Sequence, residues 1–568
     1  MAWGAEYRGW WVDAFRPGMK SASEVAQLVA NARRANVNTL VVQVRRRGDA
    51  YYESALEPKA TDVTPATFDP LAELLRLAHD TTGGKPRLDV HAWIVTYNIW
   101  NRQTNVPTQP THPYRVRPGW LTQDASGALW DGSNYAFDPA HPEVQDHTVA
   151  VALDLVSRYA VDGLHLDYIR YNGSQWGYNP VAVERFLQRT GRSTRPAPTD
   201  LSWKQFRRDE VTALVRRVYL AATQARPLLR VSAATITFAP GISATSQWPS
   251  SAAFGEVLQD WRAWMEEGLI DVNMPMAYFR QGANGADWSA WSTFAKNHGY
   301  GRHVALGVAT YLNTPVDSLT QLRSTRARTS LGGGADGMVL YSYGSPASDG
   351  TSIGAWADAL RQGLAGDALP PLFASPDVVP SMPWKHAPTK GHVLGRLPGA
   401  DGVPVTLNRA GQRTLRTDGN GWFGAVGVEP GEARVTATWS GERWVGLARV
   451  TAGAVAEPRW WRAGADDDGD GVGNEEELLC GTDPGAAADR PRWGVAMTAG
   501  RLRLTLPTAP GGREFVVWSA DTMGPGATWR EVRRVATSPG MRGVDVDVDV
   551  SVESGAAGFF RVEVRWAP

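Results

Sequence analysis

Apolar and β-branched runs alternate with amphipathic helical segments along the first 366 residues of the chain. Several helical segments begin with a capping pattern, such as Ser-Ala-Ser-Glu at 21–24 or Asp69 followed by Pro70. This alternation is typical of a parallel sheet covered by helices. It predicts eight strands, at residues 9–14, 38–45, 88–96, 162–168, 230–237, 270–278, 303–310 and 337–343.

Eight strand–helix pairs predict an α/β fold, a (β/α)8 TIM barrel over residues 1–366, with its chemistry at the C-terminal ends of the strands. An open doubly wound sheet is the rival interpretation. Such a sheet normally carries a glycine-rich phosphate loop after its first strand, whereas residues 13–18 read Asp-Ala-Phe-Arg-Pro-Gly. The barrel is therefore favoured.

The helical pattern stops after residue 366, and six prolines predict a stiff linker over residues 367–389. Short alternating strands separated by glycine-containing turns then predict a small all-β sandwich domain at 390–457 and a second one at 490–568. Residues 458–489 form the connector between the two sandwiches.

This connector has the spacing of an EF-hand-like calcium loop. Side-chain oxygens fall at loop positions 1, 3, 5, 9 and 12, with a glycine at position 6 and a backbone carbonyl at position 7. The expected ligands are Asp466, Asp468, Asp470, Val472 through its carbonyl, Asn474 and Glu477. A solvated acidic linker would explain the charge, but it would not explain the glycine or the register. We therefore expect a structural calcium ion here.

The fourth predicted strand carries the first candidate for catalysis. Its alternation sends Leu164 and Leu166 to one face and His165 and Asp167 to the other. The leucines should meet the helices, so His165 and Asp167 should point into the barrel near its mouth. A buried charge there is costly unless it is paired or used, and Arg170 is close enough in sequence to be the partner.

Neighbouring strand ends add aromatic, amide and charged side chains, which together suit a sugar. Besides His165 and Arg170, the expected substrate-binding residues at these strand ends are Arg45, His91, Trp93, Tyr97, Asn98, Tyr341 and Tyr343. Glycoside cleavage needs two carboxyl groups. Asp167 is the first, and Asp49 is the second choice, although an ion pair between Asp49 and Arg45 is an alternative. Glu53, Asp13 and Asp271 remain possible acids, of which Asp271 starts its strand and so lies at the wrong end of the barrel.

Several motifs carry a family resemblance. Arg8-Gly-Trp-Trp, Gln43-Val-Arg, His91-Ala-Trp and Asp162-Gly-Leu-His-Leu-Asp-Tyr-Ile-Arg-Tyr resemble the glycosyl-hydrolase-like family ten, whose barrels are distantly similar to those of the α-amylase type. The resemblance implies a glycosidase in which Asp167 corresponds to the catalytic aspartate of strand four, and it adds Tyr278 to the substrate-binding residues. Two departures stand out: strand five, 230–237, has no carboxylate, and Met276 replaces an amide before Tyr278.

The later segments carry weaker resemblances. Residues 390–436 are similar to carboxypeptidase regulatory-like β-sandwiches, and the calcium loop with its continuation Leu478-Leu-Cys-Gly-Thr-Asp-Pro is similar to thrombospondin type 3 repeats. Both kinds of module favour a secreted or cell-surface setting, with cell-wall or matrix association, although the start of the chain shows no secretory leader.

The composition limits the classes of binding partner that we expect. Lys and Arg total 58 and Asp and Glu total 58, so no broad positive field is present and nucleic acid is not expected as a partner. No apolar run is long enough to span a membrane. The sequence therefore predicts a glycoside hydrolase acting on a bacterial cell-wall or extracellular polysaccharide, with no cofactor in the active site. The alternative is a catalytically inactive glycan-binding or adhesion protein.

Overall fold

A computed structural model of the 568-residue chain describes residues 4–489, 491, 494–498, 501–507, 509, 511, 513–520, 527–537, 545–548 and 559–566. The chain forms two compact units. The first contains residues 1–402, 415–431 and 450–456, and the second contains residues 403–414, 432–449 and 457–568. Each unit is described by itself below.

The first unit is built on a closed barrel of eight parallel strands that follow one another in chain order around the barrel. They are β1 (Tyr7–Val12), β2 (Thr39–Arg45), β3 (Asp89–Val95), β6 (Gly163–Asp167), β7 (Arg230–Thr235), β8 (Val272–Ala277), β9 (His303–Ala309) and β10 (Gly337–Tyr341). The predicted (β/α)8 barrel and its eight strands are thus confirmed, and the open doubly wound sheet is excluded because β1 pairs with β10.

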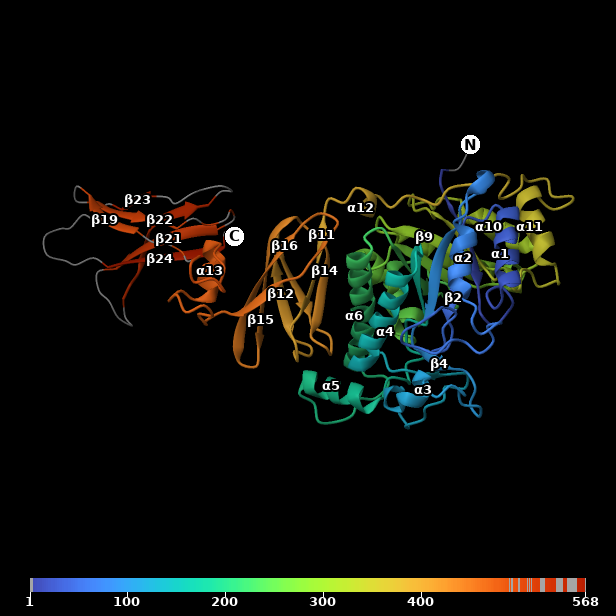
Figure 1. Ribbon diagram of the computed structural model, residues 1–568, viewed down its shortest axis with the longest axis horizontal. Helices are drawn as coiled ribbons and strands as arrows, with labels where there is room; N and C mark the ends of the chain where they lie inside the picture. Colours follow the sequence, from blue (N-terminus) through green and yellow to red (C-terminus); the bar gives the residue numbers. More distant parts are fainter. Residues whose placement is uncertain are drawn as a thin grey trace. The chain divides into compact units, whose positions relative to one another are not determined.

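Helices surround the barrel (Figure 1). The longer ones are α1 (Ala22–Arg34), α2 (Pro70–Ala78), α4 (Pro142–Arg158), α5 (Pro180–Thr190), α6 (Leu201–Ala225), α8 (Trp261–Glu267), α9 (Gln281–Asn297), α10 (Pro315–Thr325) and α11 (Ile353–Gln362). The predicted caps are present: the Ser21 hydroxyl accepts a hydrogen bond from the amide of Glu24, and Asp69 accepts one from the amide of Ala72.

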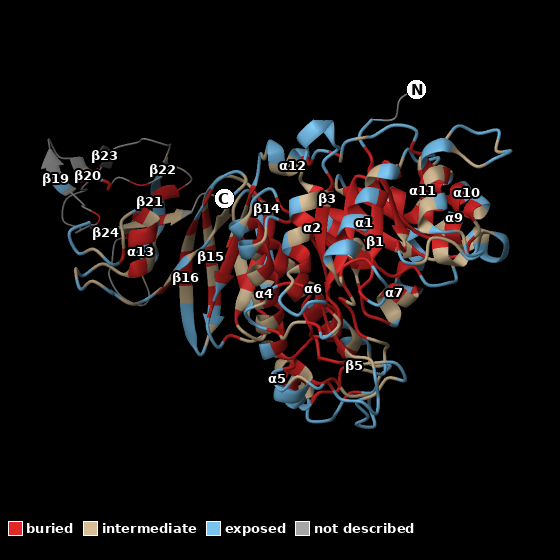
Figure 2. Cartoon of the chain, turned by 45° about the vertical axis from the view of Figure 1, so that its right-hand side comes forward, coloured by how far each residue is buried: buried red, intermediate tan, exposed pale blue. Residues whose placement is uncertain are grey.

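Strand alternation divides the buried side chains into two cores. Leu164 and Leu166 pack on the helix side, in a core that runs between the strands and the outer helices (Figure 2). A second apolar cluster fills the barrel interior and consists of Tyr7, Trp11, Val41, Trp93, Val272, Met274, Ala305 and Val339. Because both faces of each strand are buried, the strands read as almost continuous apolar runs.

A long insertion follows β3. It contains β4 (Asn98–Trp100), α3 (Pro113–Val116) and β5 (Tyr135–Ala136), with the 3-10 turn Pro118–Trp120 between the last two. This insertion lies at the lower edge of the view in Figure 1, whereas α12 (Pro383–His386) lies at the opposite end of the barrel. The lower edge is therefore the mouth of the barrel, where the strands end.

The segment predicted as a linker, 367–389, packs against the base of the barrel. Val379 contacts the interior cluster and Met382 is fully buried. Trp384 donates its indole N–H to Asp271 Oδ1 at 2.8 Å, and Lys385 Nζ lies 2.7 Å from Asp271 Oδ2. This base segment is thus part of the first unit, which continues to residue 402.

Beyond the base segment, the described residues form mainly β-sheets. The sheet β14 (Trp422–Val428), β11 (Gly391–Arg396) and β17 (Val455–Ala456) belongs to the first unit, where Val426 and Leu394 join the same core as Leu220 of α6. A five-stranded sheet has the order β13 (Gln412–Arg416), β12 (Pro404–Asn408), β15 (Gly431–Trp439), β16 (Glu442–Val450) and β18 (Arg459–Arg462). The strands of these two sheets lie in the region predicted as the first sandwich, except β18, which lies in the predicted connector.

The second unit also holds helix α13 (Asn474–Cys480) and two three-stranded antiparallel sheets in the region predicted as the second sandwich. Their strands are β19 (Gly494–Thr498), β20 (Arg501–Thr505) and β23 (Asp545–Val548), then β22 (Arg530–Ala536), β21 (Arg513–Ala520) and β24 (Phe559–Trp566). Parts of the predicted second sandwich lie outside the described residues. Among those that are described, no helix combines the length and apolarity needed to cross a bilayer.

Candidate active site

Asp167 is the last residue of β6, so its carboxylate lies at the mouth of the barrel. Three donors hold it: Trp93 Nε1 donates to Oδ2 at 3.1 Å, while the Tyr168 amide at 2.7 Å and Arg170 Nη1 at 3.5 Å donate to Oδ1. Burial raises the pKa of Asp167, and the charge of Arg170 opposes this rise. The predicted ion pair between Asp167 and Arg170 is confirmed.

Three tyrosines stand around this carboxylate at the ends of the next strands. The rings of Tyr278 and Tyr341 stack with centroids 5.3 Å apart, and Tyr311 meets both edge-on, at 6.2 Å from Tyr278 and 5.6 Å from Tyr341. All three are partly exposed. Asp167 is connected to this group through Trp93, which donates to its carboxylate and contacts the ring of Tyr341. Sequence reasoning missed Tyr311, which directly follows β9 in the turn Thr310–Leu312.

Two tryptophans form the floor below these rings. Trp11 lies 6.1 Å from Tyr278 and 6.2 Å from Tyr341, and Trp93 lies 6.5 Å from Tyr341. The site thus combines one buried carboxylate with flat apolar surfaces, the pairing that recognises a sugar ring and its hydroxyls. Trp11 was also missed as a site residue. The doublet Trp10-Trp11 gave a signal, because strand alternation sends only one of the two rings into the barrel.

His165 supports the floor from below. Its Nε2 accepts a hydrogen bond from the indole N–H of Trp11 at 3.2 Å, so the other ring nitrogen, Nδ1, carries the proton and faces Ser232 Oγ at 2.9 Å. Burial lowers the pKa of His165 well below its usual value, which keeps the ring neutral. His165 is fully buried, so it positions Trp11 and does not reach substrate as the sequence had suggested.

His91 lies deeper in the barrel. Its ring faces Gly163, where a Cβ would come within 2.6 Å of the ring. Neither ring nitrogen has a hydrogen-bond partner among the described residues, and burial lowers the pKa of His91 to about 3. Its electrostatic neighbours are Arg230, Asp162 and Asp271, which stand at the starts of strands. His91 is therefore remote from the mouth.

Arg45 and Asp49 do not form a pair. Arg45 binds the fully buried Glu57, with Nε 2.7 Å from Oε2, and its Nη1 donates to the carbonyls of Val95 and Thr96 at the end of β3. Asp49 instead pairs with Arg46 at 2.8 Å. The alternative of an Asp49–Arg45 ion pair is thus wrong. Arg45 acts on the backbone that follows Trp93, a position different from the predicted contact with substrate.

Asp13 provides a second carboxylate at the mouth. It directly follows β1 and is buried. Its Oδ1 accepts from the amide of Phe15 at 3.1 Å, and its Oδ2 lies 3.4 Å from Arg16 Nη1. After burial, the charges of Asp13 and Asp167 are the largest causes that raise the pKa of the Tyr341 phenol. Tyr341 pairs with Trp11, two residues before Asp13, and its ring contacts Trp93, which donates to Asp167, so Tyr341 lies between the strand ends that carry the two carboxylates.

The remaining predicted residues lie elsewhere. Tyr343 packs at 5.6 Å from Trp10, and its hydroxyl accepts from Asn31 of α1 at 3.1 Å, so it is on the helix side of the barrel. Tyr97 joins the helix-side core, and Asn98 is buried in the small β4–β5 sheet. Glu53 binds Lys59, and Asp271 lies at the barrel base as expected.

Comparison with known proteins identifies the barrel. The family described as Glycosyl hydrolase-like 10 matches residues 7–312, more than half of the chain. The chain belongs to this family. The matched range of the glycosyl hydrolase-like 10 domain includes Asp13, Asp167, Tyr278 and Tyr311.

Two curated relatives are named as glycosyl hydrolases. YngK of Bacillus subtilis (strain 168) is 24% identical over 395 residues, which cover 64% of this chain and 68% of YngK. DigH of Escherichia coli (strain K12) is 26% identical over 275 residues, which cover 43% of this chain and 55% of DigH. The chain thus matches only about half the length of DigH.

Solved structures give weaker matches to this glycosyl hydrolase-like 10 chain. The glycoside hydrolase domain of PgaB (BpsB) from Bordetella bronchiseptica is 14% identical with a TM-score of 0.45, covering 64% of this chain and all of that domain. The catalytic domain of a β-amylase from Paenibacillus polymyxa is 12% identical with a TM-score of 0.40, covering 61% of this chain and 96% of that domain.

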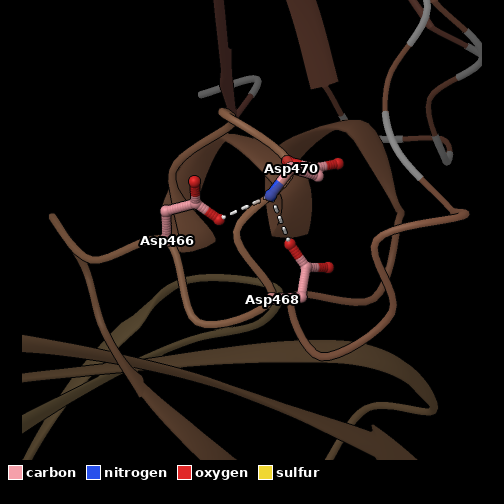
Figure 3. A group of neighbouring side chains, drawn as sticks. All are labelled: Asp466, Asp468 and Asp470. Carbon is pink, nitrogen blue, oxygen red and sulfur yellow. Dashed lines mark hydrogen bonds between the residues drawn. The ribbon is translucent and has the colours of Figure 1, made fainter.

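The acidic loop lies outside the part that matches the glycosyl hydrolase-like 10 family, in the second unit. Asp466, Asp468 and Asp470 each present a carboxylate oxygen, and these oxygens lie within 4.8 Å of one another (Figure 3). The loop is shaped by its own carboxylates: the Asp470 amide donates to Asp466 Oδ1 and to Asp468 Oδ1, each at 3.2 Å.

Glu477 of α13 is a further acidic residue of this loop. It is fully buried, and burial together with the charges of Asp468 and Asp470 raises its pKa to about 7. Asp468 Oδ2 and Glu477 Oε2 are buried and have no hydrogen-bond partner within the described part of the chain. Asn474 is occupied otherwise, because its Oδ1 accepts from the Asp467 amide and its Nδ2 donates to the Arg462 carbonyl. Val472 donates its amide to Asp470 Oδ1.

Proposed function

We propose that the barrel hydrolyses glycosidic bonds of a bacterial cell-wall or extracellular polysaccharide, with Asp167 as the carboxylate at the reacting carbon. One observation carries this proposal: Asp167 is buried at the end of the fourth strand, held by three donors and faced by partly exposed tyrosines. The membership of the glycosyl hydrolase-like 10 family supports it.

The three donors suit an ionised Asp167. Both oxygens of this carboxylate accept hydrogen bonds, and the positive charge of Arg170 lies beside it, and these interactions favour the ionised form. An ionised carboxylate is what an oxocarbenium-like transition state requires on one face of the sugar ring. Asp167 therefore acts as nucleophile or as base, and Arg170 and Trp93 fix its orientation.

The second carboxyl group is Asp13 in place of Asp49. Asp13 and Asp167 both border Tyr341, whereas Asp49 is tied to Arg46 and to the amide of Arg47. Asp13 is then the second carboxyl group that the reaction needs. Tyr278, Tyr311 and Tyr341 offer the apolar faces against which the sugar packs.

Replacement of the carboxylates tests the assignment. We expect Asp167→Asn to reduce the release of reducing ends from a cleaved polysaccharide by at least about a hundredfold, because the charge that stabilises the transition state is lost. Asp13→Asn should reduce it as well, whereas the matched variant Asp49→Asn should retain most of the rate. A rate for Asp167→Asn equal to that of the unaltered protein would falsify the proposal.

A second candidate function rests on β7. This strand, Arg230–Thr235, carries no carboxylate, and Met276 stands where the family has an amide. The alternative is a catalytically inactive protein that binds glycans or mediates surface adhesion. Oligosaccharide binding without any product over a broad panel of glycans would favour it.

We also propose that the acidic loop binds a structural calcium ion through Asp466, Asp468, Asp470 and Glu477. The crowded carboxylates and the two unpartnered buried oxygens support this, because a hard cation that prefers oxygen ligands would satisfy both. Residues 390–457 and this loop would then be accessory modules of the carboxypeptidase regulatory-like and thrombospondin type 3-like kinds. Such modules fit a secreted or cell-surface protein associated with wall or matrix.

A further inference from the structure

The proposed reaction does not account for the exposure of two phenylalanines at the barrel mouth. Phe15 is 50% exposed and Phe238 is 49% exposed, although a phenylalanine is usually buried. Each stands three residues beyond the end of a barrel strand, Phe15 after Val12 of β1 and Phe238 after Thr235 of β7. Both therefore lie at the same end of the barrel as Asp167.

The strand order places these two residues on opposite sides of the mouth. From β1, one route around the barrel to β7 passes β10, β9 and β8, and the other passes β2, β3 and β6. Three strands separate β1 from β7 on either route. Phe15 and Phe238 thus follow strands on opposite sides of the barrel.

The route through β10, β9 and β8 is lined by aromatic residues without a gap. Tyr341 ends β10, Tyr311 follows β9, and Tyr278 follows β8. With Phe15 and Phe238 at the two ends, five consecutive strands each contribute one partly or half-exposed ring. The rings of Tyr278, Tyr311 and Tyr341 contact one another at the centre of this series. An aromatic arc of this kind suits several sugar units in a row, because each unit can lay its apolar face on a ring.

The two carboxylates lie toward the two ends of this arc. Asp13 belongs to the β1 side, two residues from Phe15, and Asp167 ends β6, the strand that pairs with β7. Both border Tyr341 between them. A sugar chain lying on the arc would therefore extend from the reacting centre toward Phe15 in one direction and toward Phe238 in the other.

Both phenylalanines are held in place before any ligand arrives. The guanidinium carbons of Arg46 and Arg47 lie 5.4 and 5.7 Å from the centre of the Phe15 ring, and the Phe15 amide donates to Asp13. The carbonyl of Phe238 accepts from the indole N–H of the fully buried Trp291 at 3.0 Å. A ring held between neighbouring side chains, as that of Phe15 is, loses little conformational entropy on binding.

We propose that Phe15 and Phe238 are sugar-stacking platforms on opposite sides of the scissile bond, so that the enzyme cleaves inside glycan chains. This rests on the proposed glycosidase function and adds the class of substrate, a long chain held at both sides. An enzyme that removes units from a chain end gains nothing from a platform beyond its terminal pocket, whereas cleavage inside a chain uses both platforms.

The first experiment follows the products of the full-length protein on a panel of soluble bacterial glycan strands, amylose, mixed-linkage β-glucan and chitosan. We expect the chain length of the cleaved polymer to fall early, together with the release of reducing ends. Products that consist only of terminal mono- or disaccharides from the start would overturn the inference while leaving the glycosidase function intact.

The second experiment uses a reducing-end-labelled oligosaccharide ladder of the cleaved polymer. Phe15→Ala and Phe238→Ala should each lower kcat/KM on long oligosaccharides about two- to tenfold, with little change on the shortest cleaved one. The two variants should shift the position of the cut in opposite directions. Tyr300→Ala is the matched control, because Tyr300 is 43% exposed and lies before β9, at the other end of the barrel.

An unchanged cut position in both phenylalanine variants would reject the platforms. If no glycan of the panel is cleaved, labelled oligosaccharide ladders of each panel glycan are titrated against Asp167→Asn with and without each phenylalanine replacement. Loss of affinity for the long members only, in both double variants, supports the two-sided arc even though the proposed catalysis has failed. Equal affinities across the variants reject the arc on its own.

Discussion

Burial of the Asp167 carboxylate lowers the free energy of unfolding, and the size of this effect depends on pH. Burial raises its pKa, so the folded state holds the proton more tightly than the unfolded state does. Below the usual aspartate pKa the group is protonated in both states. As the pH rises from the usual pKa to the raised pKa of the folded protein, the free energy of unfolding falls.

Asp167→Asn should therefore be more stable than the unaltered protein at pH 7, with a difference that shrinks as the pH falls through the raised pKa toward the usual aspartate value. Urea unfolding at several pH values measures this difference. Asp49→Asn is the control of opposite sign, because Asp49 forms a buried ion pair with Arg46 whose loss should lower the free energy of unfolding at pH 7. A loss of stability in both variants would contradict the prediction.

Single residues also show where sequence reasoning stops. Alternation placed Asp167 and His165 correctly because both lie inside β6. It failed for Tyr343, since β10 ends at Tyr341 and the chain then turns toward α1. The partner of Arg45 was missed because Glu57 is brought to it by the loop after β2, whose path no local pattern encodes.

At the scale of elements, the buried pair Arg45–Glu57 connects the loop after β2 to the end of β3. Glu57 also meets His147 of α4 at 2.9 Å, and the charges of Arg45 and His147 hold its pKa well below the usual value in spite of burial. A carboxyl with a lowered pKa contributes stability above its unfolded pKa, and this contribution is lost as the pH falls through the folded pKa.

Glu57→Gln should lower the free energy of unfolding at pH 7 by about 3 kcal/mol, because it leaves the buried guanidinium of Arg45 without a charge partner. It should also lower kcat, since Arg45 holds the carbonyls that follow Trp93. Chemical unfolding and steady-state kinetics check both effects. Glu53→Gln serves as the control in the same loop, where the exposed pair with Lys59 is worth at most about 1 kcal/mol.

The base segment is an element that the sequence described only in part. Its prolines correctly indicated an irregular, extended path, but contacts with residues more than a hundred positions earlier decide where it lies. Lys385 and Arg302 hold the pKa of the buried Asp271 below its usual value against the effect of burial. No periodic pattern in residues 367–389 indicates that this segment binds Asp271.

Lys385→Met should therefore lower the free energy of unfolding at neutral pH by about 3 kcal/mol, because Asp271 loses a buried partner. The loss should diminish at acid pH, where Asp271 becomes protonated. Lys390→Met is the matched control: its pair with Glu429 is largely exposed and should be worth less than about 1 kcal/mol. Equal effects of the two replacements at pH 7 would show that the base segment contributes little.

At the scale of the whole molecule, the proposed glycosidase site and the proposed calcium site belong to different units. The carboxylates at the barrel mouth belong to the first unit, and the acidic loop belongs to the second. The sequence predicted the functional end of the barrel because a (β/α)8 barrel fixes it, whereas calcium binding by the acidic loop stays a prediction that rests on local spacing. The division of the residues 390–457 between two units depended on tertiary contacts and was not predicted.

This separation predicts that calcium acts on stability without acting on turnover. Because a bound ion stabilises only the folded loop, calcium at about a hundred times its dissociation constant should stabilise the second unit by about 2.7 kcal/mol. Calorimetry of the full-length chain should then show one transition whose temperature rises with calcium and falls with a chelator, while the glycosidase rate stays constant.

Asp468→Asn should abolish the calcium response. Asp467→Asn, whose side chain is outside the group of three carboxylates, should retain it. A chelator that leaves every transition unchanged would remove the basis for the calcium site, and one that also stops turnover would contradict the independence of the two units.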